Sequence, residues 1–129
     1  MPKSRKTPRR TVLIVDDDVS VLRALARRVR ADGFEVLTFD RPGLLLAADI
    51  PKSNACLVLD VNLPEMNGVE LYEALVAVGC HLPVIMITGR NDPRARRLLE
   101  RVKAVGVLFK PFEDSTFLEA ISRAVPYQH

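Results

Sequence analysis

The sequence predicts an α/β protein built on one doubly wound parallel sheet of five strands, with helices covering both faces. Five short runs of apolar residues alternate with segments whose apolar residues recur at helical spacing. This alternation is typical of parallel strands joined by right-handed helical crossovers. The length of 129 residues fits a single domain with a hydrophobic core of its own.

The first strand is expected at Thr11–Val15, a mostly β-branched run that ends in the aspartates of residues 16–18. In the next segment an apolar stripe at helical spacing opposes several arginines, and it consists of Val21, Leu22, Leu25, Ala26 and Val29. Asp18 or Ser20 can cap the first turn of this helix, and Gly33 suits its end.

Residues 34–39 are expected to form the second strand. Asp40 can cap a second helix of about ten residues, with Pro42 in its first turn. The third strand, residues 55–59, is apolar throughout, which predicts a strand buried on both faces. Asp60 stands at its end, and residues 64–68 read as a loop because they begin with proline and end with glycine.

Residues 69–78 are expected to form the third helix, with Leu71, Leu75 and Val78 on its inner stripe. Pro83 opens the fourth strand, Val84–Thr88, in keeping with proline at the first position of a strand.

A fourth helix is expected over residues 94–103, with Leu98, Leu99 and Val102 facing inward. A fifth strand at 105–109 and a last helix at 114–125 complete the alternation.

Charge is unevenly distributed along the chain. Residues 1–10 carry five bases and no acid, giving +5, and the remainder carries 14 bases and 16 acids, giving −2, which sums to the net +3. We expect a basic flexible N-terminal arm over 1–10, a folded domain over 11–125 and a short tail over 126–129. The arm is either a solvated extension or a non-specific contact for nucleic acid or an acidic partner.

Composition excludes several classes of protein. No apolar run approaches the roughly 20 residues of a membrane span. Cys56 and Cys80, the two cysteines, do not make a disulfide framework or a zinc site. Cys56 lies in the apolar third strand and is expected to be a free buried thiol, which favours a reducing, cytoplasmic setting.

Polar side chains follow four of the five predicted strands, and they are Asp16 and Asp17, Asp60, Thr88 and Lys110. Each alone has a simpler explanation; the aspartate run, for example, suits a helix N-terminus. Parallel strands present their carboxyl ends at one edge of a sheet, where ligands bind in such folds. The joint occurrence therefore favours one shared site.

Such a site needs a cation. Two carboxylates about 4 Å apart repel by roughly 4 kcal/mol at an effective dielectric constant of about 20. Oxygen ligands without nearby histidine or cysteine favour Mg²⁺. An ionised Asp60 beside Mg²⁺ and Lys110 can act as a nucleophile toward phosphorus, with Thr88 donating to a phosphoryl oxygen.

The motifs Val-Asp16-Asp17-Asp18, Asp60-Val-Asn-Leu-Pro-Glu-Met-Asn-Gly68, Ile-Thr88-Gly and Lys110-Pro-Phe, in this order and spacing, resemble those of a response-regulator receiver domain of two-component signal transduction. The resemblance covers about residues 11–125 and implies a flavodoxin-like sheet of strand order 2-1-3-4-5 with five helices.

The resemblance also implies residue roles. Asp60 matches the phosphoacceptor, and Asp16 and Asp17 match the acidic pair of the Mg²⁺ site. Asn62 matches the position whose backbone carbonyl completes the metal shell. Thr88 and Lys110 match the switch hydroxyl and the phosphate-binding lysine, and the Lys110-Pro111 bond is cis in such domains.

The implied partner is a histidine kinase or phosphotransfer protein, and the receiver itself catalyses its phosphorylation and dephosphorylation rather than acting as a conventional enzyme. The face made by the fourth helix, fifth strand and fifth helix is expected to contact an output domain or a second receiver. Nucleic acid is expected only through an output domain absent from this sequence, and no membrane contact is expected. On the fourth helix, Arg94, Arg96, Arg97 and Arg101 form either a solvated face or a contact for an acidic partner.

One departure from the family keeps a rival function open. Val107 stands where the family usually has a switching tyrosine or phenylalanine, and Phe109 lies on the same side of the strand. The alternative is a receiver-like binding module that no longer takes phosphate. A phosphohydrolase using Asp60 is disfavoured, because it needs an acid two residues later and position 62 is asparagine.

Overall fold

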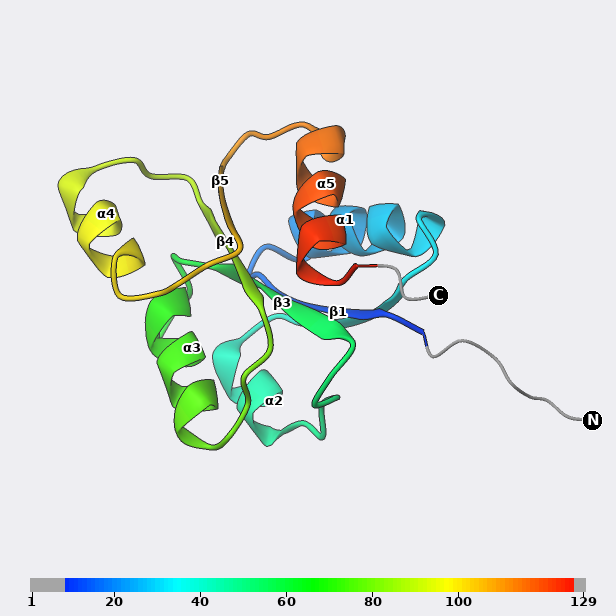
Figure 1. Ribbon diagram of the computed structural model, residues 1–129. Helices are drawn as coiled ribbons and strands as arrows, with labels where there is room; N and C mark the ends of the chain where they lie inside the picture. Colours follow the sequence, from blue (N-terminus) through cyan, green and yellow to red (C-terminus); the bar gives the residue numbers. More distant parts are fainter. Residues whose placement is uncertain (1–8, 127–129) are drawn as a thin grey trace, which may run out of the picture.

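A computed structural model describes residues 9–126 of the chain. Strands and helices alternate along it (Figure 1), with the bounds β1 Thr11–Val15, α1 Val19–Ala31, β2 Glu35–Phe39, α2 Pro42–Ala47, β3 Ala55–Asp60, α3 Gly68–Ala77, β4 Val84–Thr88, α4 Pro93–Leu99, β5 Gly106–Phe109 and α5 Asp114–Ala124.

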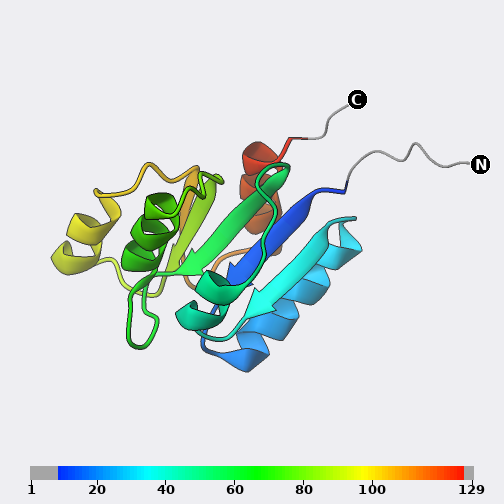
Figure 2. The same ribbon diagram turned by 90° about the horizontal axis from the view of Figure 1, so that it is seen from below.

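The five strands form one sheet in the order β2-β1-β3-β4-β5, and every pairing is parallel. The predicted fold class and strand order are therefore confirmed. Helices α1 and α5 lie on one face of the sheet, and α2, α3 and α4 lie on the other (Figures 1 and 2). The register pairs Val15 with Leu59 and Thr88 with Phe109, so the carboxyl ends of the strands lie close together along one edge.

The core has two layers because successive residues of a strand point to opposite faces of the sheet. Val12 and Ile14 of β1 pack into the layer under α1 and α5, whereas Leu13 and Val15 pack into the layer toward α2 and α3. All six residues of β3 are buried, as expected for the central strand of a sheet covered on both faces.

Helix α1 begins and ends as its sequence predicts. The side chain of Asp18 accepts hydrogen bonds from the backbone amides of Ser20 at 3.0 Å and Val21 at 3.3 Å. Gly33, just beyond the C-cap, has φ of +95°, a conformation that glycine adopts without steric cost.

The second helix is shorter than predicted, and the expected cap is wrong. Helix α2 covers only six residues, Pro42–Ala47, and its N-cap is Arg41, which makes no side-chain capping bond. Asp40 instead accepts a hydrogen bond from the Arg41 Nε at 3.3 Å. Pro42 still occupies the first turn, where a missing N–H costs nothing.

Two other predicted positions are also corrected. Val78 is 77% exposed because α3 ends at Ala77 and Gly79 turns the chain with φ of +93°. Helix α4 ends at Leu99 rather than at 103, since the chain must reach the sheet, where the Val105 amide bonds the Val84 carbonyl at 2.8 Å. Val102 lies in the turn that follows α4, and its side chain is nevertheless buried, as predicted.

Most of the predicted N-terminal arm, residues 1–8, and the tail residues 127–129 lie outside the described residues. Of the arm's last two residues, Arg9 pairs with Glu35 at 3.2 Å. The Arg10 guanidinium lies 4.3 Å from the centre of the Phe34 ring and donates to the Val125 carbonyl at 3.1 Å. Among the described residues no helix is both long and apolar enough to cross a membrane.

Candidate functional site

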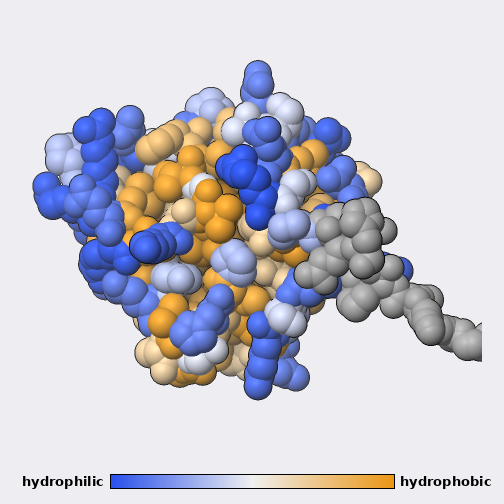
Figure 3. Space-filling model, in the orientation of Figure 1, coloured by the Kyte–Doolittle hydropathy of each residue, from blue (hydrophilic) through white to orange (hydrophobic). Residues whose placement is uncertain are grey.

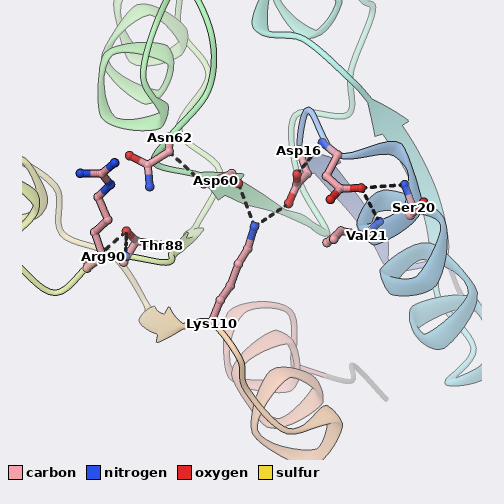
Figure 4. A network of polar contacts seen from close by, with 9 residues as sticks. Asp16, Ser20, Val21, Asp60, Asn62, Thr88, Arg90 and Lys110 are labelled. Carbon is pink, nitrogen blue, oxygen red and sulfur yellow. Dashed lines mark hydrogen bonds and ion pairs between the residues drawn. The ribbon is translucent and has the colours of Figure 1, made fainter.

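Three charged side chains that are distant in the sequence meet at the carboxyl edge of the sheet (Figure 4). The Lys110 ammonium, just after β5, donates to Asp60 Oδ2 at 3.0 Å and to Asp16 Oδ2 at 3.2 Å. The strand order explains this meeting. Asp16 follows β1, which is next to β3 with Asp60 at its end, and Lys110 follows β5, which only β4 separates from β3.

The two carboxylates are held in the same way by their own loops. Asp16 Oδ1 accepts a hydrogen bond from the Asp18 amide at 2.9 Å, and Asp60 Oδ1 accepts one from the Asn62 amide at 2.9 Å. In each case the backbone amide two residues later binds one oxygen, which leaves the second oxygen facing Lys110. The local turn geometry therefore orients both acids toward the same point.

Burial sets the electrostatics of the site. Asp16 is 1% exposed and Asp60 is 5% exposed. Burial raises the pKa of Asp16, and the nearby charge of Asp60 adds to it, against the opposing effects of the Asp18 amide and Lys110. Burial also acts to lower the pKa of Lys110, but its hydrogen bonds and charge attraction to Asp60 and Asp16 outweigh burial and leave that pKa raised. The lysine therefore stays charged between the two acids.

A third acid makes the cluster suitable for a divalent cation. Asp16, Asp17 and Asp60 each offer a carboxylate oxygen, and these oxygens lie within 4.8 Å of one another. Asp17 is exposed, so the cluster is open to solvent on its side. Three carboxylates against one ammonium leave an excess of negative charge when all are ionised, and oxygen donors of this kind fit Mg²⁺ or a similar hard cation.

Thr88 lies at the same edge, but its hydroxyl is directed elsewhere. The side chain is fully buried, and its oxygen donates to the Arg90 carbonyl at 3.2 Å and accepts from the Arg90 amide at 3.0 Å (Figure 4). The Thr88 carbonyl accepts from the Lys110 amide at 2.9 Å, which ties the ends of β4 and β5 together. Of the predicted site residues, the structure thus brings together the three acids and the lysine, and it leaves the threonine hydroxyl in its own loop.

From the sequence, Gly68 was placed in the loop and at the end of the family motif, but the close contact that requires glycine there was not predicted. A Cβ at this position would lie 2.3 Å from the Asp60 carbonyl oxygen. The Gly68 amide bonds the Val61 carbonyl at 2.9 Å, so the start of α3 presses against the end of β3. A glycine as the first residue of a helix, where other residues are favoured, was the available signal.

The loop before α3 is also stabilised by a capping box. The Asn67 side chain accepts from the Glu70 amide at 2.8 Å, and the Glu70 side chain accepts from the Asn67 amide at 3.0 Å. The helix start that carries Gly68 is therefore well defined.

A cavity of about 390 Å³ adjoins the acids between the β3–α3 loop and α4. Its polar lining comes from Asp17, Asn62, Asn67 and Arg94. Asp17 and Asn62, which both line it, are exposed, so the cavity opens to solvent beside the cluster.

The Lys110-Pro111 peptide bond is cis, as the resemblance implies. It turns the chain from the end of β5 toward α5.

Comparison with known proteins agrees with this geometry. Residues 12–122 match the response regulator receiver domain family. Nodulation protein W of Bradyrhizobium diazoefficiens is 38% identical over 114 residues, which are 88% of this chain and 50% of that protein. Transcriptional regulatory protein FixJ of Rhizobium meliloti is also 38% identical over 114 residues, covering 88% of this chain and 56% of that protein.

The solved structure of FixJ-N superimposes with a TM-score of 0.79 at 36% identity, covering 95% of this chain and 98% of that one. The chain spans about half the length of the curated relatives named above. With the strand order, the acidic cluster and the family match in agreement, the chain belongs to the response regulator receiver domains of two-component signalling.

Proposed function

We propose that this receiver takes a phosphoryl group onto the Asp60 carboxylate in a Mg²⁺-dependent reaction. The observation that carries the proposal is the Lys110 ammonium held between the buried carboxylates of Asp60 and Asp16, at 3.0 and 3.2 Å. A lysine in this place already occupies the position from which it can pair with a phosphoryl oxygen on Asp60.

The transfer itself needs little from the protein beyond placement and charge. One Asp60 oxygen attacks the phosphorus of a phosphohistidine, the phosphorus–nitrogen bond breaks, and its electron pair stays on the imidazole nitrogen. An ionised carboxylate has no proton to lose, so no general base is required. Water attacking the same phosphorus later releases inorganic phosphate and restores Asp60.

Asp16, Asp17 and Asp60, with the backbone carbonyl of Asn62, would hold the Mg²⁺. When bound, the ion neutralises charge on the phosphoryl oxygens and supplies Lewis-acid stabilisation. Lys110 supplies the second positive charge, exchanging its bond to Asp60 for one to the phosphoryl group.

Thr88 supplies the switch in this proposal. Its hydroxyl can donate its proton to a phosphoryl oxygen only after it gives up the hydrogen bond that it donates to the Arg90 carbonyl, whereas its oxygen can still accept from the Arg90 amide. The loop from β4 to α4 would then rearrange. A bias of about 1.4 kcal/mol in this equilibrium changes the populations about tenfold.

The rearrangement would be transmitted to the face formed by α4, β5 and α5. There, apolar surface lies over β5 between α4 and α5 (Figure 3), with Val107 37% and Phe109 41% exposed. In our proposal this face contacts an output domain or a second receiver. A histidine kinase or phosphotransfer protein is the donor, the setting is cytoplasmic, and any nucleic-acid contact belongs to an output domain.

The test is phosphorylation of the isolated chain by acetyl phosphate and Mg²⁺, followed by intact mass. We expect one phosphoryl group on the wild type, none on Asp60→Asn and none after chelation of Mg²⁺. Asp40→Asn is the matched control, because Asp40 also follows a strand end but lies outside the cluster. A wild type that stays unmodified supports the rival, a receiver-like binding module. Repeated turnover of a phosphate ester would instead indicate a phosphohydrolase.

A further inference from the structure

A groove of about 540 Å³ lies between α1 and α2 at the edge of the sheet formed by β2. Figure 2 shows β2 running between these two helices. The groove is on the opposite edge of the sheet from β5, and its lining comes from α1, the end of β2 and the residue after it, and α2.

One wall of the groove is basic. Arg23, Arg27 and Arg30 are four and three residues apart, so they form one stripe along α1. All three are exposed, and within residues 9–126 none of them forms an ion pair or a side-chain hydrogen bond. Arg28, which lies outside the groove, is by contrast paired with Asp114 at 3.3 Å. The stripe is therefore a set of cations without partners in the described domain.

The acid in the lining does not neutralise this stripe. Asp40 is bonded to Arg41 Nε at 3.3 Å. Three arginines and one aspartate leave the lining at +2, whereas residues 11–129 as a whole carry −2. The groove lining therefore carries a net positive charge on a domain whose net charge is negative, which favours an anionic partner.

The other surfaces of the groove are apolar. Val19 is 44% exposed and Leu44 is 48% exposed, on the two helices that border it. Leu22 and Ala26 are buried beneath them. Apolar side chains beside an unpaired cationic stripe are suited to a ligand that has both an acidic and an apolar side.

We propose that this groove docks an acidic amphipathic helix of a partner protein. The stripe spans two helical turns, about 10 Å, so a helix with acids at positions i, i+4 and i+7 matches its length and spacing. Leucines or similar residues on the adjoining stripe of that helix would cover Val19 and Leu44. Docking here does not depend on phosphorylation, and it leaves the α4–β5–α5 face open.

The probe is a synthetic helical peptide of about four turns with glutamates at i, i+4 and i+7 and leucines beside them. It is titrated into the isotope-labelled chain, and amide shifts are followed by NMR at low and high salt. We expect saturable shifts confined to α1, the end of β2 and α2, with affinity falling as salt rises. A peptide with glutamine in place of glutamate should bind about tenfold more weakly.

The variant Arg23→Glu/Arg27→Glu should weaken binding by about tenfold or more. The matched control is Arg97→Glu/Lys103→Glu, which reverses two exposed bases in and just after α4, outside the groove lining, and should leave affinity at the groove unchanged. If the first variant fails to fold, Arg23→Gln/Arg27→Gln serves in its place and should still weaken binding.

Three results would overturn the proposal. One is no shift in α1 or α2 at peptide concentrations of about 1 mM. Another is equal binding by the glutamine peptide or by the charge-reversed variant, which would make the contact merely apolar. The third is binding of phosphatidylglycerol vesicles without binding of the peptide, which would assign the groove to an anionic lipid surface.

Discussion

Replacing Gly68 with alanine tests whether the start of α3 must press against the end of β3. The new Cβ would lie 2.3 Å from the Asp60 oxygen, 2.9 Å from its carbonyl carbon and 3.1 Å from the Val61 Cα. All three are backbone atoms, so no side-chain rotation can relieve the overlap. The helix start and the strand end must instead move apart.

Overpacking of this kind costs about 1–3 kcal/mol. Alanine is favoured over glycine in a helix by up to about 1 kcal/mol, which offsets part of that cost. Because the closest contact is a rigid backbone oxygen, we expect the upper part of the range and a net loss of about 2 kcal/mol. For a domain of this size that corresponds to a Tm lower by roughly 5–10 °C.

The assay is urea unfolding followed by circular dichroism, with Gly43→Ala as the matched control. Gly43 lies in α2, and a Cβ there would meet no atom within 4 Å, so this variant should be as stable as wild type or more stable by up to about 1 kcal/mol. The reasoning is refuted if Gly68→Ala is as stable as wild type or shifts in the same direction as the control.

Other predictions concern the buried thiol and the acids. Burial raises the pKa of the Cys56 thiol to about 12, so iodoacetamide should modify the half-buried Cys80 before Cys56 in the folded chain, as mass spectrometry can show. In the unfolded chain the pKa of this thiol is near 9.0, so between pH 9 and pH 12 the folded state binds more protons than the unfolded state. The free energy of unfolding should therefore fall above pH 9, by up to about 1.4 kcal/mol per pH unit from Cys56. Cys56→Ala should remove that slope. The pKa of Asp16 is also raised in the folded state, so the ionised carboxylate costs stability once the pH exceeds its unfolded pKa, near 3.8. Without metal, Asp16→Asn should therefore gain stability relative to wild type as pH rises from 4 to 7. A stability difference in urea titrations that does not change with pH would contradict this. Mg²⁺ should raise the Tm of the wild type once the Mg²⁺ concentration exceeds the Kd for the ion, because binding stabilises the folded state. This Tm shift should be smaller in Asp17→Asn and unchanged in the control Asp40→Asn, both measured in Ca²⁺-free buffer.

Much of the fold was predictable because burial is periodic in sequence. The apolar run of β3 is typical of a strand covered on both faces, and the apolar stripe of α1 is typical of a helix that faces a core. The capping of α1 by Asp18 was predictable for a similar reason, since a helix start depends on a few neighbouring residues. The boundaries of α2 and α4 were predicted wrongly, because the length of each helix depends on where the chain must join the next strand of the sheet.

The sequence by itself determined which residues carry charge at the strand ends, and parallel strands bring such ends to one edge of a sheet. Only the tertiary structure decided which of them touch. It joined Lys110 to Asp16 and Asp60 but turned the Thr88 hydroxyl to Arg90, and it left no room for a Cβ at Gly68 beside the Asp60 carbonyl. A hydrogen bond or a steric overlap depends on tenths of an ångström between segments that are distant in the chain, and those separations are set by how the helices and strands pack together.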